Sequence, residues 1–355
     1  MKPLRLLACL LPALAACGTT VTLSDDFSYD WSFAPFDKFT ATLHSPYVVN
    51  TAVSLSVTSS DDHQDFTGWQ LESSDGSVFA IDSFYADKYG MYGSAHTAGA
   101  GTARLSVVDA GGKELGARVV EAATPDRVEL DAHAYLIIGE NDLAPVDEVR
   151  ILENGTATYL VRYFNAGREL TGNGILSVNS SAQFIGAHTT KKFLDENREW
   201  LQLTATATDQ GTIEMVVNGV SQGTLPVVVA QEPDMSSVAM LSSPEKGHKD
   251  GDWLVAYAQA YDAQQHRVFG VDYTWNVAGV QALGDGDLYR YEYKKGDVVT
   301  VIASRGTLSD STTIQSDGGY VDSSNNLGCA AGGGSVGVLV GLAGIALVAR
   351  RRRAR

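Results

Sequence analysis

The feature that most constrains this sequence is the alternation of apolar and polar residues in short runs that end at turn dipeptides. In 53–58, Val and Leu alternate with Ser and Thr, and 156–163 is rich in β-branched and aromatic residues. Asn218-Gly219 and similar pairs separate such runs. A period of two predicts half-buried strands, and Asn-Gly pairs predict tight turns. Because no long stretch has a helical period, the sequence predicts an all-β protein built as sandwiches.

One strand–turn–strand pattern recurs three times. It occupies 101–121, 211–229 and 296–314, with a Gly-containing turn inside each copy. This pattern resembles the closing hairpin of a bacterial immunoglobulin-like domain. The resemblance implies tandem immunoglobulin-like β-sandwiches, and adhesion at a cell surface is a typical role of such proteins.

Tryptophans support two of the three units. Trp69 and Trp275 each stand upstream of the closing hairpin of their unit, which begins at Gly101 and Gly296, as expected of a core tryptophan on an early central strand in this family. The middle unit departs from the pattern, because Trp200 stands late, at the start of the strand that precedes the closing hairpin. The middle unit therefore has less support as a member of this family than the other two.

The N-terminus resembles a bacterial lipoprotein signal. Lys2 and Arg5 precede an apolar segment that ends in Leu14, Ala15 and Ala16, and Cys17 follows directly. The segment is too short to cross a bilayer, which takes about 20 residues. The resemblance implies cleavage by a lipoprotein-processing peptidase and lipidation of Cys17. With Gly18 next, it implies the outer membrane or the cell surface; the alternative is an ordinary signal peptide.

The C-terminus carries a second candidate address. An uncharged stretch, 330–349, is long enough to span a bilayer as a helix, and an arginine cluster follows it. Cys329 before such a helix resembles the MYXO-CTERM sorting tail of myxobacterial surface proteins, although the match at the cysteine is partial. The resemblance implies that a tail-sorting protease cleaves near Cys329. A permanent transmembrane anchor is the alternative.

These features divide the chain into segments. The expected order is a lipoprotein signal peptide (1–16), a polar tether (17–38), immunoglobulin-like domains (39–123, 124–230 and 231–315), a spacer (316–328) and the sorting tail with its hydrophobic helix (329–355).

Charge and cysteine content limit the kinds of partner and chemistry. The chain carries 26 basic and 42 acidic side chains, a net charge of −16. The two terminal segments contain seven of the basic and none of the acidic side chains, so the mature chain is more acidic still. Such a surface repels nucleic acid. The only cysteines are Cys9, Cys17 and Cys329, which excludes a disulfide framework and a cysteine nucleophile in the body.

Two sets of candidate binding residues remain. Acidic turns at Asp250, Asp252, Asp285 and Asp287 offer hard oxygen ligands for calcium, although Asp also favours turns for its own hydrogen bonds. No other cofactor is indicated.

The second set is aromatic. Tyr289, Tyr291 and Tyr293 alternate, so they share one face of a strand and could stack on sugar rings if exposed, or pack in the core if buried. A second aromatic cluster, between Phe79 and Tyr92, allows the same two interpretations.

No catalytic constellation stands out. Two GxSxG matches, at Ser221 and Ser335, lack the strand–turn–helix context that a nucleophile elbow needs. We therefore expect a non-enzymatic surface lipoprotein that acts in adhesion, cohesion or envelope spacing through a glycan or protein partner. The alternative is a carbohydrate-binding module for envelope or matrix polysaccharide.

Overall fold

The computed structural model describes residues 21–27, 39–61, 63–132, 145–181, 183–191, 198–242, 253–277, 280–282, 288–292 and 298–315. Within these ranges the regular structure is β-strand, apart from a single 3-10 turn, η2 (Glu232–Asp234). The all-β prediction is confirmed. No helix in the described ranges is long and apolar enough to cross a membrane. The expected span at 330–349 lies outside them, as do the signal peptide and the spacer.

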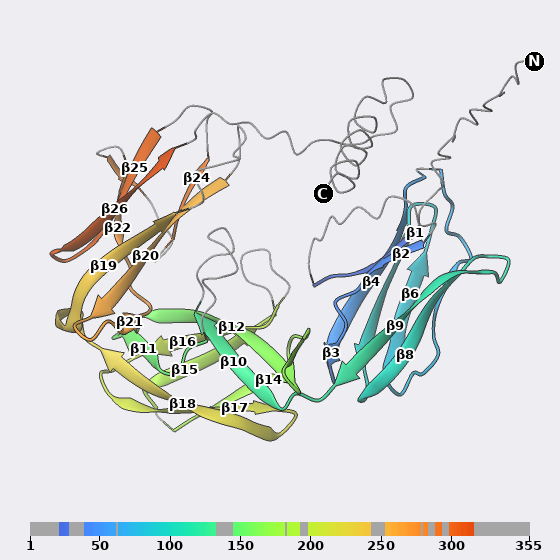
Figure 1. Cartoon of the computed structure of the whole chain (residues 1–355), viewed down its shortest axis with the longest axis horizontal. Helices are drawn as coiled ribbons and strands as arrows, with labels where there is room; N and C mark the ends of the chain where they lie inside the picture. The colour runs from blue at the N-terminus through green and yellow to red at the C-terminus, as the bar shows by residue number, and fades with distance from the viewer. Residues whose placement is uncertain are drawn as a thin grey trace, which may run out of the picture. The chain divides into compact units, whose positions relative to one another are not determined.

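The strands form three pairs of sheets, and each pair encloses one hydrophobic cluster (Figure 1). We call these pairs the first, second and third sandwich, in chain order. Each cluster draws side chains from both of its sheets, because alternate residues of a strand face inward.

The first sandwich joins the sheets β2-β1-β4-β7-β6 and β3-β9-β8-β5. Its core includes Leu23, Phe79 and Leu105, which are fully buried. The strands are β1 (Val21–Asp25), β2 (Phe39–Thr42), β3 (Tyr47–Val48), β4 (Ala52–Ser59), β5 (Gln70–Ser73), β6 (Phe79–Ala86), β7 (Met91–Thr97), β8 (Gly101–Val108) and β9 (Glu114–Ala123).

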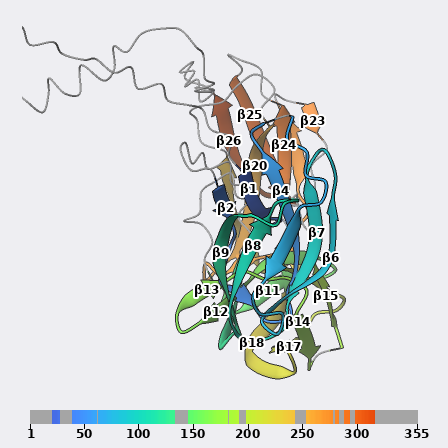
Figure 2. The same ribbon diagram turned by 90° about the vertical axis from the view of Figure 1, so that its right-hand side faces the viewer.

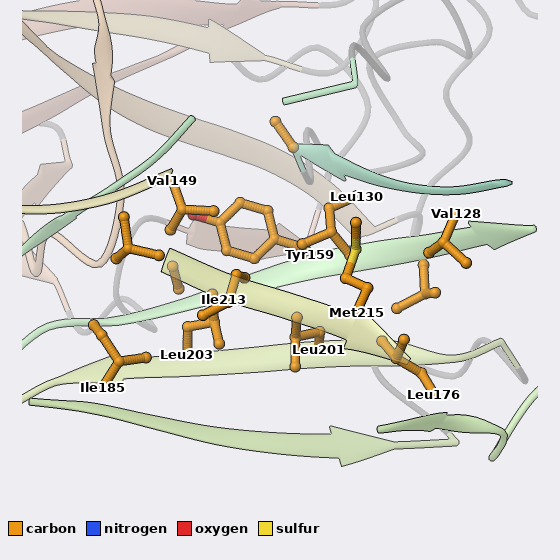
Figure 3. Close-up of a cluster of buried hydrophobic side chains, with 14 of the residues drawn as sticks. Val128, Leu130, Val149, Tyr159, Leu176, Ile185, Leu201, Leu203, Ile213 and Met215 are labelled. Carbon is orange, nitrogen blue, oxygen red and sulfur yellow. The ribbon is translucent and has the colours of Figure 1, made fainter. Parts of the chain in front are cut away.

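The second sandwich joins β10-β12-β16-β15, with β13 beside β12, to β11-β18-β17-β14. Figure 3 shows Leu201 and Leu203 of one sheet close to Ile213 and Met215 of the other. The strands are β10 (Arg127–Ala132), β11 (Val149–Leu152), β12 (Thr156–Asn165), β13 (Arg168–Leu170), β14 (Leu176–Ser180), β15 (Ile185–Thr190), β16 (Trp200–Ala205), β17 (Gln210–Val217) and β18 (Val220–Ala230).

The third sandwich joins β19-β20-β21, with β24 beside β20, to β23-β22-β25-β26. Trp275 and Val301 lie in its core. The strands are β19 (Met235–Ser242), β20 (Trp253–Asp262), β21 (Arg267–Val268), β22 (Thr274–Val277), β23 (Val280–Ala282), β24 (Leu288–Glu292), β25 (Val298–Arg305) and β26 (Leu308–Gln315).

The three expected closing hairpins are present as antiparallel pairs: β8 with β9, β17 with β18, and β25 with β26. Asn218 and Gly219 turn the middle hairpin with φ of 51° and 78°, the left-handed backbone that Asn and Gly tolerate best. Trp200 begins β16 and is buried in the second sandwich, so its late position in the sequence is compatible with a core role.

The range 17–38, which we expected to be a polar tether, contains the strand β1. Val21 and Leu23 are buried in the first core, and β1 pairs with both β2 and β4. Asp25 at its end accepts hydrogen bonds from the Tyr47 hydroxyl (2.5 Å) and the His44 amide (2.7 Å). The tether prediction is therefore wrong for these residues, because a five-residue alternating run was too short to stand out.

Candidate functional site

Most residues singled out from the sequence lie outside the described ranges. These are Cys17, Cys329, Asp250, Asp252, Asp285, Asp287 and Tyr293. Among the residues that the structure does describe, no group of three or more His, Cys, Asp or Glu side chains could hold a metal ion. The calcium site in the acidic turns thus stays a prediction.

Tyr289 is partly buried on β24, against the third core. Its ring centroid lies 5.9 Å from that of Trp275, with an interplanar angle of 30°. Burial raises the pKa of its hydroxyl above the ordinary value. Tyr291 is placed by its backbone, which pairs with Leu254 on β20. Of the two interpretations of the alternating tyrosines, the contact with Trp275 favours packing for Tyr289.

The exposed aromatic residues lie elsewhere, on the β6–β7 hairpin of the first sandwich. Tyr85, Tyr89 and Tyr92 are 61%, 73% and 50% exposed, and they are the only large aromatic side chains this exposed among the described residues. Tyr85 pairs directly with Tyr92 across the hairpin. Strands β6 and β7 form one edge of their sheet (Figure 2). We call these three residues the tyrosine hairpin.

The turn of this hairpin is held by Asp87. Its Oδ1 atom accepts hydrogen bonds from the amides of Tyr89 (2.7 Å) and Gly90 (3.2 Å), which uses the carboxylate inside the turn. The Lys88 ammonium lies 4.7 Å from the centroid of the Tyr89 ring, within the range of a cation–π contact. A Cβ atom at Gly90 would lie 2.9 Å from the Tyr92 hydroxyl oxygen. The ring of Tyr92 therefore lies against the turn.

The second feature with a functional bearing is the joint between the first and second sandwiches. Tyr47 on β3 and Thr171, just after β13, form a parallel bridge. The Val48 amide donates to the Thr171 carbonyl (2.9 Å), and the Thr171 amide donates to the Pro46 carbonyl (2.8 Å). Val48 also belongs to the core of the second sandwich. We call this contact joint 1.

The second and third sandwiches meet through the same arrangement. Ile151 on β11 and Phe269, just after β21, form a parallel bridge. The Leu152 amide donates to the Phe269 carbonyl (2.9 Å), and the Phe269 amide donates to the Arg150 carbonyl (2.8 Å). Leu152 belongs to the core of the third sandwich. We call this contact joint 2.

The two joints also match in the residues around the bridge. The bridge residue of the later sandwich follows a buried aliphatic side chain, Leu170 or Val268, and precedes a glycine, Gly172 or Gly270. The earlier sandwich continues through a residue with positive φ, Asn50 at joint 1 (71°) and Asn154 at joint 2 (63°). The same local backbone arrangement therefore occurs at both joints.

A buried carboxylate holds the chain beside the bridge residue in the second and third sandwiches. In the second sandwich, Glu199 accepts from the Tyr163 hydroxyl (2.5 Å) and from the amide of Leu176 (3.0 Å), which follows Thr171 by five residues, and burial raises the pKa of its carboxyl group. At joint 2, Asp262 accepts from the His266 amide (2.9 Å) and pairs with Arg150 across the joint (3.4 Å).

The pKa of Asp262 is shifted in the opposite direction to that of Glu199. Burial raises the pKa of Asp262, but the hydrogen bonds from His266 and Gln264, together with the charge of Arg150, lower it by more than burial raises it. The pKa of Asp262 is therefore lowered, whereas that of Glu199 is raised.

The first sandwich has a corresponding segment that meets no earlier sandwich among the described residues. Between β4 and β5 it reads Phe66, Thr67 and Gly68, in which Phe66 is buried and Thr67 is exposed. The Thr67 amide donates to Oδ1 of Asp65 (2.8 Å). The equivalent amides of Thr171 and Phe269 instead donate to a carbonyl of the preceding sandwich. Asp65 therefore takes the place of that carbonyl.

Sequence reasoning missed both joints, and it did not distinguish the tyrosine hairpin from core residues. The signal that could have found the joints is the triplet of an apolar residue, any residue and glycine before an early strand, at 66–68, 170–172 and 268–270. No single triplet is distinctive, but its recurrence once per sandwich is.

Comparisons with known proteins give weak likenesses. No known sequence family and no curated protein matches the chain. Domains 4–9 of the surface-layer protein SbsC are 16% identical and align with 74% of this chain and 42% of theirs, at a TM-score of 0.36. The Escherichia coli adhesin FdeC is 12% identical over 84% of this chain and 97% of its own, at 0.26. The integrin-binding protein invasin is 12% identical over 76% and 57%, at 0.25.

These neighbours are bacterial surface-layer and adhesin proteins. The chain spans less than half the length of the surface-layer fragment. At these identities and TM-scores the likeness carries no argument about function, which must come from the chain's own contacts.

Proposed function

We propose that the chain is a non-enzymatic cell-surface lipoprotein whose immunoglobulin-like sandwiches act in adhesion, cohesion or spacing between the envelope and its surroundings. The observation that supports this best is the repeated joint. A linker without contacts leaves neighbouring domains free to reorient, whereas each joint here has two backbone hydrogen bonds and one side chain in the next core. Such joints suit a protein that must hold a distance.

Anchoring is part of the same proposal. Lipidation of Cys17 would tie the first sandwich to the outer membrane, and cleavage near Cys329 would release the other end from the inner membrane. Acyl chains contribute about 0.8 kcal/mol per buried CH₂ group, and several chains together give stable attachment. The lipoprotein-processing peptidase and the tail-sorting protease are the partners that this route requires.

The experiment compares cells that carry the wild-type chain with cells that carry Cys17→Ser. We expect intact mass to show lipid on the wild type alone, and surface proteolysis to release the body from wild-type cells only. Cohesion or adhesion of the cells should fall with the variant. A matched control is Ser221→Ala, which removes the GxSxG hydroxyl from the β17–β18 hairpin and should change nothing. Equal surface display and cohesion in the Cys17→Ser cells would contradict the proposal.

A further inference from the structure

The tyrosine hairpin lies at the end of the first sandwich from which the N-terminal segment leaves. β4 pairs Ser59 with Val21 and, two residues earlier, Val57 with Met91 at the start of β7. Val21 is therefore level with the 87–90 turn and two strands away from β7 in the same sheet. Neighbouring strands are about 4.8 Å apart, so the separation across the sheet is about 10 Å.

The opposite end of β7 leads to joint 1. Thr97, its last residue, donates from its hydroxyl to the carbonyl of Val48 (2.6 Å), next to the bridge. β7 has seven residues, and a strand rises about 3.3 Å per residue. The tyrosine hairpin and joint 1 thus occupy opposite ends of the first sandwich.

The chain between Cys17 and Val21 is too short to carry the sandwich far from a lipid attached to Cys17. Only three residues intervene, and four peptide steps span at most about 14 Å. A lipidated Cys17 lies at the bilayer surface. The end of the first sandwich that carries Val21 and the 87–90 turn must therefore lie close to the same surface.

The chemistry of the hairpin fits that position. Tyrosine has an apolar ring and a polar hydroxyl, and it is enriched where a protein meets the membrane–water interface. Lysine can extend its ammonium to the headgroups while its stem covers apolar surface. The carboxylate of Asp87, which lies between Tyr85 and Tyr89 in the sequence, accepts hydrogen bonds from the Tyr89 and Gly90 amides of the turn. Since the whole chain has a net charge of −16, strongly anionic headgroups would repel it.

We propose that Tyr85, Tyr89 and Tyr92 rest in the interfacial layer of the membrane that holds the lipid of Cys17, and so set how the first sandwich stands on that membrane. The partner is a lipid surface of low net charge, and the inference rests on the lipidation of Cys17 proposed above. The other sandwiches then begin at joint 1, on the side that faces away from the bilayer.

The experiment measures membrane depth with nitroxide labels. Because 18–328 contains no cysteine, Tyr89→Cys gives one labelling site in the lipidated full chain once Cys329→Ser removes the other thiol. Val119→Cys, in the same sandwich and 67% exposed, is the matched control, and Val298→Cys, 66% exposed in the third sandwich, is the distant control. The lipidated proteins are reconstituted into phosphatidylcholine vesicles, and label accessibility to oxygen is compared with that to a water-soluble nickel chelate.

We expect the ratio of oxygen to nickel accessibility to rise severalfold at position 89 on reconstitution and to stay unchanged at 119 and 298. Tyr85→Cys should behave like Tyr89→Cys, which guards against a local defect in either variant. Adding Tyr85→Ser and Tyr92→Ser to Tyr89→Cys should lower the ratio toward that of Val119→Cys.

Three outcomes would overturn the inference. A lipidated protein that floats with vesicles but shows equal ratios at 89 and 119 leaves the anchor standing and removes the membrane contact. A protein that intact mass shows to be unlipidated removes both proposals. A label at 89 that stays water-accessible but is immobilised by soluble polysaccharide would assign the tyrosines to a glycan instead.

Discussion

Joints 1 and 2 share their backbone hydrogen bonds and differ in the side chains that surround them. At joint 1 the closest neighbours are side chains, since a Cβ atom on Gly172 would lie 2.6 Å from Thr51 Oγ1. At joint 2 they are backbone atoms, since a Cβ atom on Gly155 would lie 2.3 Å from the carbonyl oxygen of Gly270. Side chains can move aside at a lower cost in free energy than two backbones in contact.

Aromatic packing adds to this difference. Phe269 is buried at joint 2, and its ring meets that of Tyr159 edge-on with centroids 5.0 Å apart. Its counterpart at joint 1, Thr171, is only partly buried. At joint 1 the side-chain Nδ2 of Asn50 donates to Oδ1 of Asn218 (2.9 Å) in an exposed position, where a hydrogen bond contributes little to stability. The two joints therefore share the geometry of the bridge and differ in the side chains packed around it, so we expect joint 2 to resist opening more than joint 1.

The largest effect should come from Gly155→Ala at joint 2. The added methyl group meets the Gly270 carbonyl, so the joint must open or both backbones must shift, at a cost of about 3 kcal/mol or more. Hydrogen exchange should show loss of protection at the Leu152 and Phe269 amides. Gly186→Ala is the control, because its Cβ atom would meet only ordinary contact, 3.9 Å from the Thr204 carbonyl oxygen. Unchanged protection of these two amides in Gly155→Ala would contradict the expectation that joint 2 is the more sensitive of the two joints to an added methyl group.

A smaller effect is expected from Gly172→Ala at joint 1, about 1 kcal/mol. Thr51 and Val48 can both adjust, and calorimetry should detect the loss as a lower melting temperature. The Thr51 hydroxyl oxygen is buried without a hydrogen-bond partner among the described residues, so Thr51→Ala alone should cost little. The double variant should recover part of the loss. A double variant as unstable as the sum of the two single variants would show that the methyl group does not meet Thr51.

The smallest effect is an opposite response of the two joints to pH. Because the pKa of Asp262 is lowered from 3.8, its contribution is present above that value and is lost as pH falls through the folded-state pKa. The pKa of Glu199 is raised from 4.5, so its contribution is present below that value and is lost as pH rises through the folded-state pKa.

The measurement is the protection factor of the Phe269 amide relative to that of Thr171 between pH 7 and about pH 3. We expect this ratio to fall at the acidic end. Asp262→Asn should remove the acid loss at joint 2, and Glu199→Gln should flatten the response at joint 1. Protection factors that fall in parallel at both joints would show that neither carboxylate controls its joint.

Local sequence predicted the strands and hairpins because their signals are local. The alternation in 53–58 and the Asn218-Gly219 pair act over a few residues, and the structure follows them. The joints connect Tyr47 to Thr171 and Ile151 to Phe269, more than 100 residues apart, and no local period reports such pairing. Likewise, alternation placed Tyr289 on a strand, but only the folded structure shows that Tyr85 and Tyr92 are exposed while Tyr289 packs against Trp275.

The hydrogen bond from the Thr67 amide to Asp65 has a consequence for what can dock on the first sandwich. The equivalent amides of Thr171 and Phe269 each donate to a carbonyl of the preceding sandwich, whereas the Thr67 amide already donates within its own turn. A carbonyl that approached Thr67 would have to displace the Asp65 carboxylate first. Asp65 thus makes this triplet a poorer docking point than the other two, although all three triplets end in the same glycine.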